Sequence, residues 1–309
     1  MELFDGIEAV PPGYGPSAVT VGKFDGVHLG HRAVIARLRA LATERGLSAV
    51  AMTFDRHPLA FHAPDACPVS LVSLAQKLDL LAHTGLDATV LLRYDAALAS
   101  VTAEEFVRDH LVGALGARAL LVGRDFRYGA GNTGDVALLE RLAPELGFEV
   151  IVVDDVVPED DRKVSSTWIR ELLGEGRVRE AGELLGRPPV LRSTVVHGER
   201  LGRELGFPTA NLDPAVEGFI PLDGVYATWA TIDGVRYPAA TSIGNNPTFE
   251  GVPEHRIEAH LIDATVDAYD RTIELEFVDR LRGMVRFDSV DALISALAAD
   301  VARVRELLA

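Results

Sequence analysis

The stretch VTVGKFDGVHLGHRA, from Val19 to Ala33, constrains the fold of this chain more than any other. Small and β-branched residues over Ala18–Gly22 predict a buried parallel strand. Glycines then interrupt the strand, and a helical pattern starts near His31. A strand, a glycine turn and a helix N-terminus form a ready anion site, because free backbone N–H groups and the helix dipole point the same way. The stretch therefore predicts an α/β unit that binds phosphate.

Two histidines, His28 and His31, stand three residues apart in this turn. An imidazole in this place can donate to phosphate oxygens. That suits transfer of a nucleotidyl group, in which negative charge grows on the α-phosphate as pyrophosphate leaves. A single histidine would more simply be a loop residue with incidental partners. Two histidines with three spaced glycines, Gly22, Gly26 and Gly30, favour the functional interpretation.

Strand and helix signals alternate up to about residue 185. Strands are predicted at Ser48–Phe54, Ala88–Leu92, Ala117–Gly123 and Phe148–Val153, and helices at Ala33–Leu47, Leu74–His83 and Val136–Leu146. Thr102 and Glu105 form a capping box ahead of a further helical run. This alternation predicts a doubly wound parallel sheet with right-handed crossovers, whose ligands bind at the carboxyl ends of the strands.

Three more segments of this half are candidate binding sites. TFDRHP, with His57 and Pro58, and VGRDFRYGAGNTGD, with Gly123 and Asp125, follow predicted strands and so fall at the same sheet edge as the histidine turn. In VSSTWIR, Ser165, Ser166 and Thr167 are good N-cap residues for a predicted helix that carries Arg170 one turn later. Capping and phosphate binding can hold together there.

The periodicity changes near Gly186, where glycines and Arg187-Pro188-Pro189 break the helical pattern. We therefore expect one domain over residues 1–185 and another over 186–309. The second has strand signals at Val190–Val196, Val225–Ile232, Val235–Ile243, Arg256–Ile262 and Arg271–Val278, with a type I′ hairpin signal at Asp233-Gly234. These predict a small closed antiparallel β-barrel, with an apolar-striped helix from Val290 packed on its outside.

A glycine-rich loop in the second half, GERLGRELGFPTANL, is a further phosphate-binding candidate through Gly198, Gly202, Arg203, Gly206 and Pro208. It lacks the spacing of a P-loop. Thr209 and Asn211 offer neutral oxygen ligands that Mg²⁺ accepts beside phosphates. In phosphoryl transfer to an alcohol, a carboxylate near the hydroxyl can orient it and accept its proton. Glu258, in RIEAHLID, is the candidate for that role, although a solvated glutamate on a strand is the simpler alternative.

Charge and cysteine content limit the partners and the compartment. A net charge of −16 argues against nucleic acids, which need a basic face, so positive charge must be gathered locally or supplied by Mg²⁺. Cys67 is the single cysteine, which fits a reducing cytoplasm. No signal peptide and no membrane-spanning run is recognisable. We expect a soluble cytoplasmic protein with small-molecule partners, and a weak homo-oligomer stays open.

Several motifs together resemble one known family. GKFDGVHLGH is similar to the HxGH signature of nucleotidyltransferases in the form found in prokaryotic bifunctional riboflavin kinase/FAD synthetases, and VSSTWIR is similar to their SSTxIR segment. GRELGFPTANL, GVYA and SIGNNPTF resemble the flavokinase domain. The resemblance implies two reactions with Mg²⁺. ATP phosphorylates riboflavin to FMN at the C-terminal barrel, and a second ATP adenylylates FMN to FAD, with release of pyrophosphate, at the N-terminal sheet.

The resemblance also implies roles for individual residues. His28 and His31 would be catalytic in the N-terminal domain, and Glu258 would be the catalytic base of the kinase. Ser166, Thr167 and Arg170 would contact the triphosphate. The remaining nucleotide- or flavin-binding candidates are Gly22, Phe24, Gly26, His57, Pro58, Gly123, Asp125 and Asn246.

The chain departs from the family pattern at three positions. Lys23 stands where we expect a small or apolar residue, Asp125 where some relatives have Asn, and Met284 where a Glu is common. Two alternative functions stay open at this point. One is an HxGH enzyme with another acceptor, such as a pantetheine phosphate or a pyridine mononucleotide. The other is a non-catalytic flavin-binding sensor.

Overall fold

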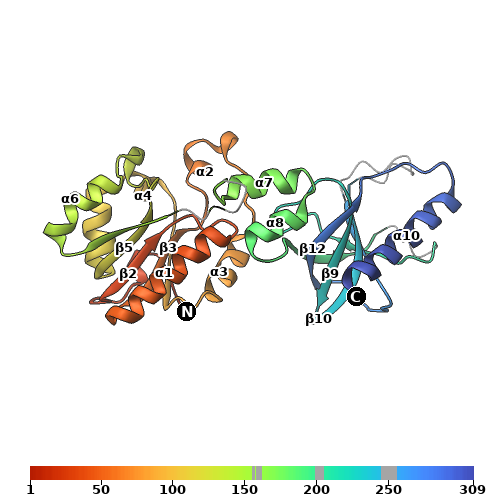
Figure 1. Ribbon diagram of the computed structural model, residues 1–309, viewed down its shortest axis with the longest axis horizontal. Helices are drawn as coiled ribbons and strands as arrows, with labels where there is room; N and C mark the ends of the chain where they lie inside the picture. The colour runs from red at the N-terminus through yellow and green to blue at the C-terminus, as the bar shows by residue number, and fades with distance from the viewer. Residues whose placement is uncertain (155–156, 158–161, 199–204, 245–255) are drawn as a thin grey trace. The chain divides into compact units, whose positions relative to one another are not determined.

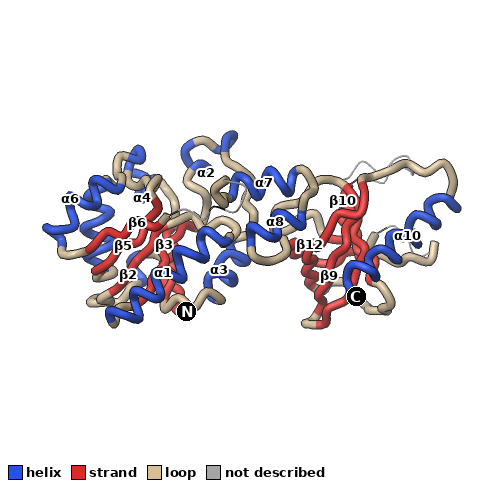
Figure 2. Tube along the Cα trace, viewed as in Figure 1, coloured by secondary structure: helices blue, strands red, loops and turns tan. Residues whose placement is uncertain are grey.

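A computed structural model describes residues 1–154, 157, 162–198, 205–244 and 256–309 (Figures 1 and 2). Residue contacts divide the chain into two compact units, Met1–Ser165 and Ser166–Ala309, and each unit is described by itself. The described ranges contain no helix with the length and apolar character needed to cross a membrane.

The first unit is built on a six-stranded sheet with the strand order β1-β4-β3-β2-β5-β6, in which every pairing is parallel. The strands are β1 (Glu2–Asp5), β2 (Ser17–Val21), β3 (Ser48–Phe54), β4 (Ala88–Leu92), β5 (Ala117–Gly123) and β6 (Glu149–Val153). β2 is buried at every residue, as predicted for the strand ahead of the histidine turn. The doubly wound parallel sheet is confirmed.

Helices cover both faces of this sheet. They are η1 (Ile7–Ala9), α1 (Leu29–Arg45), α2 (Leu59–His62), η2 (Pro64–Ala66), α3 (Leu74–Ala82), α4 (Ala96–Ser100), α5 (Ala103–Glu105), η3 (Phe106–Ala114), η4 (Ala130–Asn132) and α6 (Val136–Leu146). Successive strand residues point to opposite faces. Val19 therefore packs in the cluster that contains residues of η3 and α6, and its neighbour Ala18 packs in the cluster of α1 and α3.

The strand order places a topological switch point at β2. Its neighbour on one side is β3, the next strand along the chain, and on the other side it is β5. The loops that leave the carboxyl ends of β2 and β5 therefore run to opposite faces of the sheet, and sheets of this kind bind their ligands in the crevice at such a point. The histidine turn follows β2, and the loop with Asp125 follows β5. The fold thus brings two of the predicted binding loops to one crevice.

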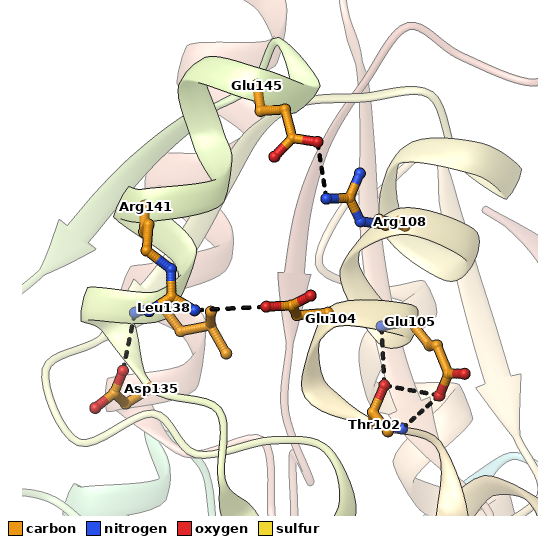
Figure 3. Close-up of polar contacts among 8 residues, drawn as sticks. All are labelled: Thr102, Glu104, Glu105, Arg108, Asp135, Leu138, Arg141 and Glu145. Atoms are coloured by element: carbon orange, nitrogen blue, oxygen red, sulfur yellow. Dashed lines mark hydrogen bonds and ion pairs between the residues drawn. The ribbon is translucent and has the colours of Figure 1, made fainter.

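Capping and ion pairs hold the helices beside the loop that follows β5 (Figure 3). The capping box at Thr102 is confirmed, since its hydroxyl accepts from Glu105 N at 3.2 Å and its N–H donates to the Glu105 carboxylate at 2.9 Å. Asp135 caps α6 by accepting from Leu138 N at 2.9 Å. Two ion pairs join α6 to the preceding helices: Arg108 of η3 pairs with Glu145 at 2.8 Å, and Glu104 of α5 pairs with Arg141 at 3.5 Å.

The second unit is a closed antiparallel barrel with the strand order β10-β11-β8-β7-β12-β9. Its elements are α7 (Ser166–Gly174), α8 (Val178–Leu185), β7 (Val190–Val196), β8 (Ala210–Leu212), β9 (Gly224–Ile232), β10 (Val235–Gly244), β11 (Arg256–Leu261), β12 (Thr272–Arg282) and α10 (Val290–Leu308). Asp233 and Gly234 both have positive φ, as the predicted type I′ hairpin requires. The predicted barrel is confirmed.

The C-terminal helix α10 packs on the barrel wall, as predicted. Val301 and Val304 form an apolar cluster with Ala227 of β9 and with Ile262. A partly buried ion pair adds to this contact, because the Arg282 guanidinium at the end of β12 donates to both carboxylate oxygens of the buried Asp300.

The structure differs from the predicted elements in a few places. α1 begins at Leu29, ahead of the predicted helix, because His28 caps it. β1, which pairs with β4 at the sheet edge, and the three-residue β8 were not predicted. β12 continues to Arg282, since bulges let it follow the curved barrel wall beyond the run of clean alternation.

Candidate phosphate sites in the two units

The turn between β2 and α1 is held in a strained conformation. Phe24 has φ 48°, Gly26 φ 81° and Val27 φ 40°. Positive φ suits the glycine, but for a β-branched residue such as Val27 it is an outlier. Phe24 and Val27 are both almost completely buried, and their packing holds the backbone in place. Strain of this kind persists where the surrounding structure over-determines the backbone, and it clusters at ligand sites.

His28 is fixed as the N-cap of α1. Its Nδ1 accepts from the backbone N–H of His31 at 3.4 Å, and the residue is 5% exposed. An Nδ1 that accepts carries no proton, so the neutral ring carries its proton on Nε2 and can donate it. Gly30 makes room for this ring, because a Cβ at position 30 would lie 3.1 Å from both Cε1 and Nδ1 of His28.

His31 lies against His28 in an environment that disfavours a positive charge. The two rings stack with centroids 3.7 Å apart, and Phe24 meets His31 edge-on at 5.2 Å. Burial lowers the pKa of His31 well below 6.5, and the neighbouring His28, Lys23 and Lys163 lower it further. Within the described part of the chain, the buried Nδ1 of His31 has no hydrogen-bond partner. Lys23 and Lys163 would attract an anion that binds beside the two rings.

The neighbouring strand ends contribute further polar residues. Gly123 is the last residue of β5 and Asp125 follows the strand, and the carboxylate of Asp125 pairs with Lys163 at 3.0 Å. The hydrogen bond from Lys163 is the main reason that the pKa of Asp125 is lowered. His57 follows β3 and lines a pocket together with Lys23. Its ring Nδ1 accepts from Leu59 N at 3.1 Å, and Pro58 is the N-cap residue of α2.

Ser166, Thr167 and Arg170 lie on α7. The helix begins at Ser166, as the N-cap pattern predicts, and α7 belongs to the second of the two compact units. Ile169 between them is buried, whereas Arg170 is half-buried. Their predicted contact with a triphosphate stays a prediction.

A cluster of oxygen-bearing side chains lies on two paired strands of the barrel. Asn211 of β8 is directly opposite Glu258 of β11, and the hydroxyl of Thr209 donates to the Glu258 carboxylate at 3.4 Å. Residues of β11 alternate between buried and half-buried, so Glu258 is on the face opposite to Ile257 and Ala259, as predicted. Gly198 lies directly against this cluster, because a Cβ at this position would be 2.5 Å from the Asn211 amide carbon.

Of the remaining predicted residues of the glycine-rich loop, two are described. Gly206 has φ 86°, which favours glycine, and the carbonyl of Pro208 accepts from His260 Nδ1 at 2.8 Å. Gly202, Arg203 and Asn246 lie outside the described residues.

A divalent metal at Thr209, Asn211 and Glu258 would find a hydroxyl, an amide oxygen and a carboxylate. These hard oxygen donors fit Mg²⁺ when phosphate oxygens and water complete the shell. Among the described residues, no group of three or more His, Cys, Asp or Glu side chains is arranged to hold a metal ion. The donor set therefore fits a metal that arrives with a phosphate ligand, and not one held by the protein alone.

Sequence reasoning missed the residues that line the pocket beside His57. Lys77 and Asp55 were not named as candidates, and Lys23 was noted only as a departure from a family pattern. The signal that could have found them is the distribution of lysine, since the chain has only Lys23, Lys77 and Lys163.

Comparisons with known proteins assign a family to each part of the chain. A family model described as FAD synthetase matches residues 12–168, and one described as riboflavin kinase matches residues 185–308. The bifunctional riboflavin kinase/FMN adenylyltransferase of Pseudomonas fluorescens is 38% identical over 309 residues, covering 100% of this chain and 98% of that protein. The protein of the same name from Escherichia coli K12 is 38% identical over 289 residues, covering 93% of this chain and 91% of the relative.

A solved structure shares the fold over nearly the full length. It is a crystal structure of a protein from Streptococcus pneumoniae, titled a macrolide-efflux protein. It is 33% identical to this chain, has a TM-score of 0.86 and covers 98% of each chain.

Proposed function

This chain belongs to the family of bifunctional riboflavin kinase/FMN adenylyltransferases, and we propose that the two sites described above carry its two reactions. It phosphorylates riboflavin with ATP to give FMN, and it then transfers the adenylyl group of ATP to FMN, giving FAD and pyrophosphate. The alternatives of a flavin sensor and of another acceptor are not favoured, because both family models match and the relatives carry both activities in their names.

We assign the adenylyl transfer to the turn with His28 and His31. A phosphate oxygen of FMN attacks the α-phosphorus of ATP, and the bond from that phosphorus to the pyrophosphate oxygen breaks. The Nε2–H of His28 and the N–H groups at the start of α1 donate to the oxygens on which charge grows. The observation that carries this proposal is the stacked imidazole pair, fixed at a helix N-terminus by a cap and a glycine.

We assign the kinase reaction to the Thr209, Asn211 and Glu258 cluster. The Glu258 carboxylate orients the terminal hydroxyl of the riboflavin ribityl chain and accepts its proton as the oxygen attacks the γ-phosphorus of ATP. The ADP oxygen leaves with the electron pair of the broken bond. The hydroxyl of Thr209, which donates to Glu258, holds the carboxylate in place.

Mg²⁺ is proposed as the metal that accompanies ATP at the barrel. Thr209 and Asn211 would hold it together with phosphate oxygens, for the reasons of donor chemistry given above. When bound, the metal neutralises charge on the transferred phosphoryl group. Gly198, Gly206 and Pro208 belong to the loop that would contact the phosphates. Gly202, Arg203 and Asn246 stay predictions from the family pattern.

The domain limits are proposed as residues 1–185 for the adenylyltransferase and 186–309 for the kinase. The family models leave residues 169–184 unassigned, and the compact units divide at Ser165. Ser166, Thr167 and Arg170 are proposed as triphosphate-binding residues of the adenylyl reaction.

We propose the cytoplasm as the compartment and small molecules as the partners, on the basis of the free Cys67 and the net charge of −16.

Two single substitutions test the assignment of the sites. His28→Ala should lower the rate of FAD formation from FMN about 100-fold or more, because it removes a donor to the developing charge, and should leave FMN formation nearly unchanged. Glu258→Ala should do the reverse, with a loss of FMN formation of about 100-fold or more. Separation of riboflavin, FMN and FAD after incubation with Mg·ATP measures both steps. Equal loss of both activities in either variant would refute independent sites.

A further inference from the structure

The lysines of this chain gather at one end of the parallel sheet. Of its 30 Lys and Arg residues only three are lysine, and all three belong to the first unit. Lys23 and Lys77 line a single pocket, and Lys23 and Lys163 both depress the pKa of His31. Elsewhere the chain uses arginine as its cation. The ammonium group is a compact charge with three donors, which suits a site that must concentrate charge in little space.

The pocket that contains Lys23 and Lys77 lies at the carboxyl ends of two adjacent strands. The turn after β2 contributes Lys23 and Asp25, and the turn after β3 contributes Asp55, Arg56 and His57. Ser70, Val72, Ser73, Leu74 and Lys77, from the start of α3 and the segment before it, complete the lining. The lining is therefore polar, with three cations, two carboxylates and two hydroxyls.

Lys77 is the buried cation of this pocket. It is 8% exposed, and its Nζ donates to the carbonyl of Phe54 at 2.6 Å. An ammonium has three N–H donors, so this bond uses one of them. Burial lowers the pKa of Lys77, and the nearby Asp25 and Asp55 offset this only in part. A buried cation of this kind is stabilised by an added anion, because the anion compensates its lost hydration.

The carboxylates of Asp25 and Asp55 both accept hydrogen bonds from residues in and around the pocket. Asp25 Oδ1 accepts from Leu71 N at 2.9 Å, which ties the segment before α3 to the turn after β2. Asp55 Oδ1 accepts from Tyr94 N at 2.8 Å, and its other oxygen accepts from Arg56. These bonds hold the walls together and spread the negative charge, which reduces the repulsion that the carboxylates would exert on a bound anion.

We propose that this pocket receives the phosphate of FMN, and that Lys77 binds it. The inference rests on the adenylyl transfer proposed above, which needs the phosphate of a second nucleotide beside the α-phosphate of ATP. Lys23 and Asp25 of the pocket lie in the same turn between β2 and α1 that ends at His28. Arg56 is paired with Asp55, so Lys23 and Lys77 are the two cations that match the two charges of a phosphate monoester, and the serine hydroxyls supply further donors. Riboflavin lacks this phosphate, so the pocket makes the adenylyl step select FMN over riboflavin.

The test uses full-length variants and steady-state kinetics of FAD formation. Lys77→Met should raise the KM for FMN about 10- to 100-fold, as expected for the loss of a charge-assisted hydrogen bond, while the KM for ATP changes less than about twofold. Lys77→Arg should recover part of the loss, because it keeps the charge. FMN formation from riboflavin should be unchanged in both. Arg118→Met, at an exposed cation whose guanidinium contacts Gly147 O, is the matched control and should behave as the wild type.

A second measurement needs no substitution. Limited acetylation of the wild type, read by mass spectrometry, should show FMN protecting Lys77 more than riboflavin does, with Lys23 and Lys163 followed in the same digest. An unchanged KM for FMN in Lys77→Met, a rise confined to the KM for ATP, or a fall in kcat alone would each overturn the proposal, and so would equal protection by riboflavin. A wild type that makes no FAD from FMN and ATP would refute the proposed function instead.

Discussion

At the residue scale, the first unit depends on how two imidazoles are held. His28 is both the N-cap of α1 and a candidate donor to phosphate, so one side chain serves the helix and the chemistry. The burial of His31, together with the electrostatic effect of the adjacent His28, keeps the pKa of His31 low, so that ring stays neutral near pH 7. Neutral imidazoles donate without the cost of placing two positive charges 3.7 Å apart.

Gly30→Ala tests whether FAD formation depends on the exact position of the His28 ring. Gly30 is the second residue of α1, and alanine has a higher helix propensity than glycine. The added Cβ would lie 3.1 Å from the His28 ring, which must therefore shift by a few tenths of an ångström. We expect FAD formation to fall about tenfold, because small misplacements of a catalytic group are costly. The melting temperature should change little, because the higher helix propensity of alanine opposes any weakening of the His28 cap, and FMN formation should be unchanged. FAD formation equal to that of the wild type would contradict this account.

At the element scale, caps and surface ion pairs contribute unequally to the helices beside the loop after β5 (Figure 3). The capping box at Thr102 satisfies backbone donors at the start of α5 that would otherwise lack intrahelical partners. The Arg108–Glu145 pair spans η3 and α6 but is open to water, with side chains 40% and 60% exposed. Solvent screening and side-chain entropy reduce the value of such a pair.

Thr102→Ala and Glu145→Gln test whether the capping box stabilises these helices more than the exposed ion pair does. Thr102→Ala should lower the free energy of unfolding by about 1 kcal/mol, as is typical for the loss of an N-cap. Glu145→Gln should change it by less than about 0.5 kcal/mol, because it removes only an exposed ion pair. Denaturant unfolding followed by circular dichroism measures both. A larger effect from Glu145→Gln than from Thr102→Ala would show that the ion pairs, and not the cap, hold these helices.

At the scale of the whole molecule, the chain carries two complete folding units. The parallel sheet has an apolar cluster on each face, and the barrel has its own buried interior with Tyr226 and Phe277 in edge contact at 5.2 Å. The candidate adenylyl residues of the sheet and the oxygen cluster of the barrel draw on different secondary structure. FMN, the product of one reaction, is the substrate of the other.

A mixture of the two variants, each of which lacks one of the two activities, tests whether FMN passes through solution. His28→Ala retains the kinase and Glu258→Ala retains the adenylyltransferase, so an equimolar mixture should convert riboflavin to FAD after a lag in which free FMN accumulates. Chromatography of timed samples, with each variant alone as the control, measures this. Absence of FAD from the mixture, when each variant keeps its other activity, would mean that FMN is not released between the steps.

Local patterns determined most of the elements and the fold class. Five elements have the predicted bounds, because their hydrophobic pattern and end residues can be recognised within short segments of sequence: β3, β4, β5, α6 and β7. The edge strand β1 was not predicted, since four residues carry little periodicity and depend on pairing with β4. The histidine turn, the PTAN segment and Glu258 were found because each combines reactive side chains with turn or strand signals within a few residues.

Tertiary structure alone decided which of these segments meet. Strand order placed the loops after β2 and β5 at one switch point, and that order depends on long-range pairing that no local pattern encodes. The same pairing set β3 beside β2, which brought Asp55 and His57 to the pocket of Lys23, while α3 carried in Lys77. On its helix Lys77 has the appearance of an ordinary surface cation. Only packing against the end of β3 buries it and turns it into a candidate phosphate ligand.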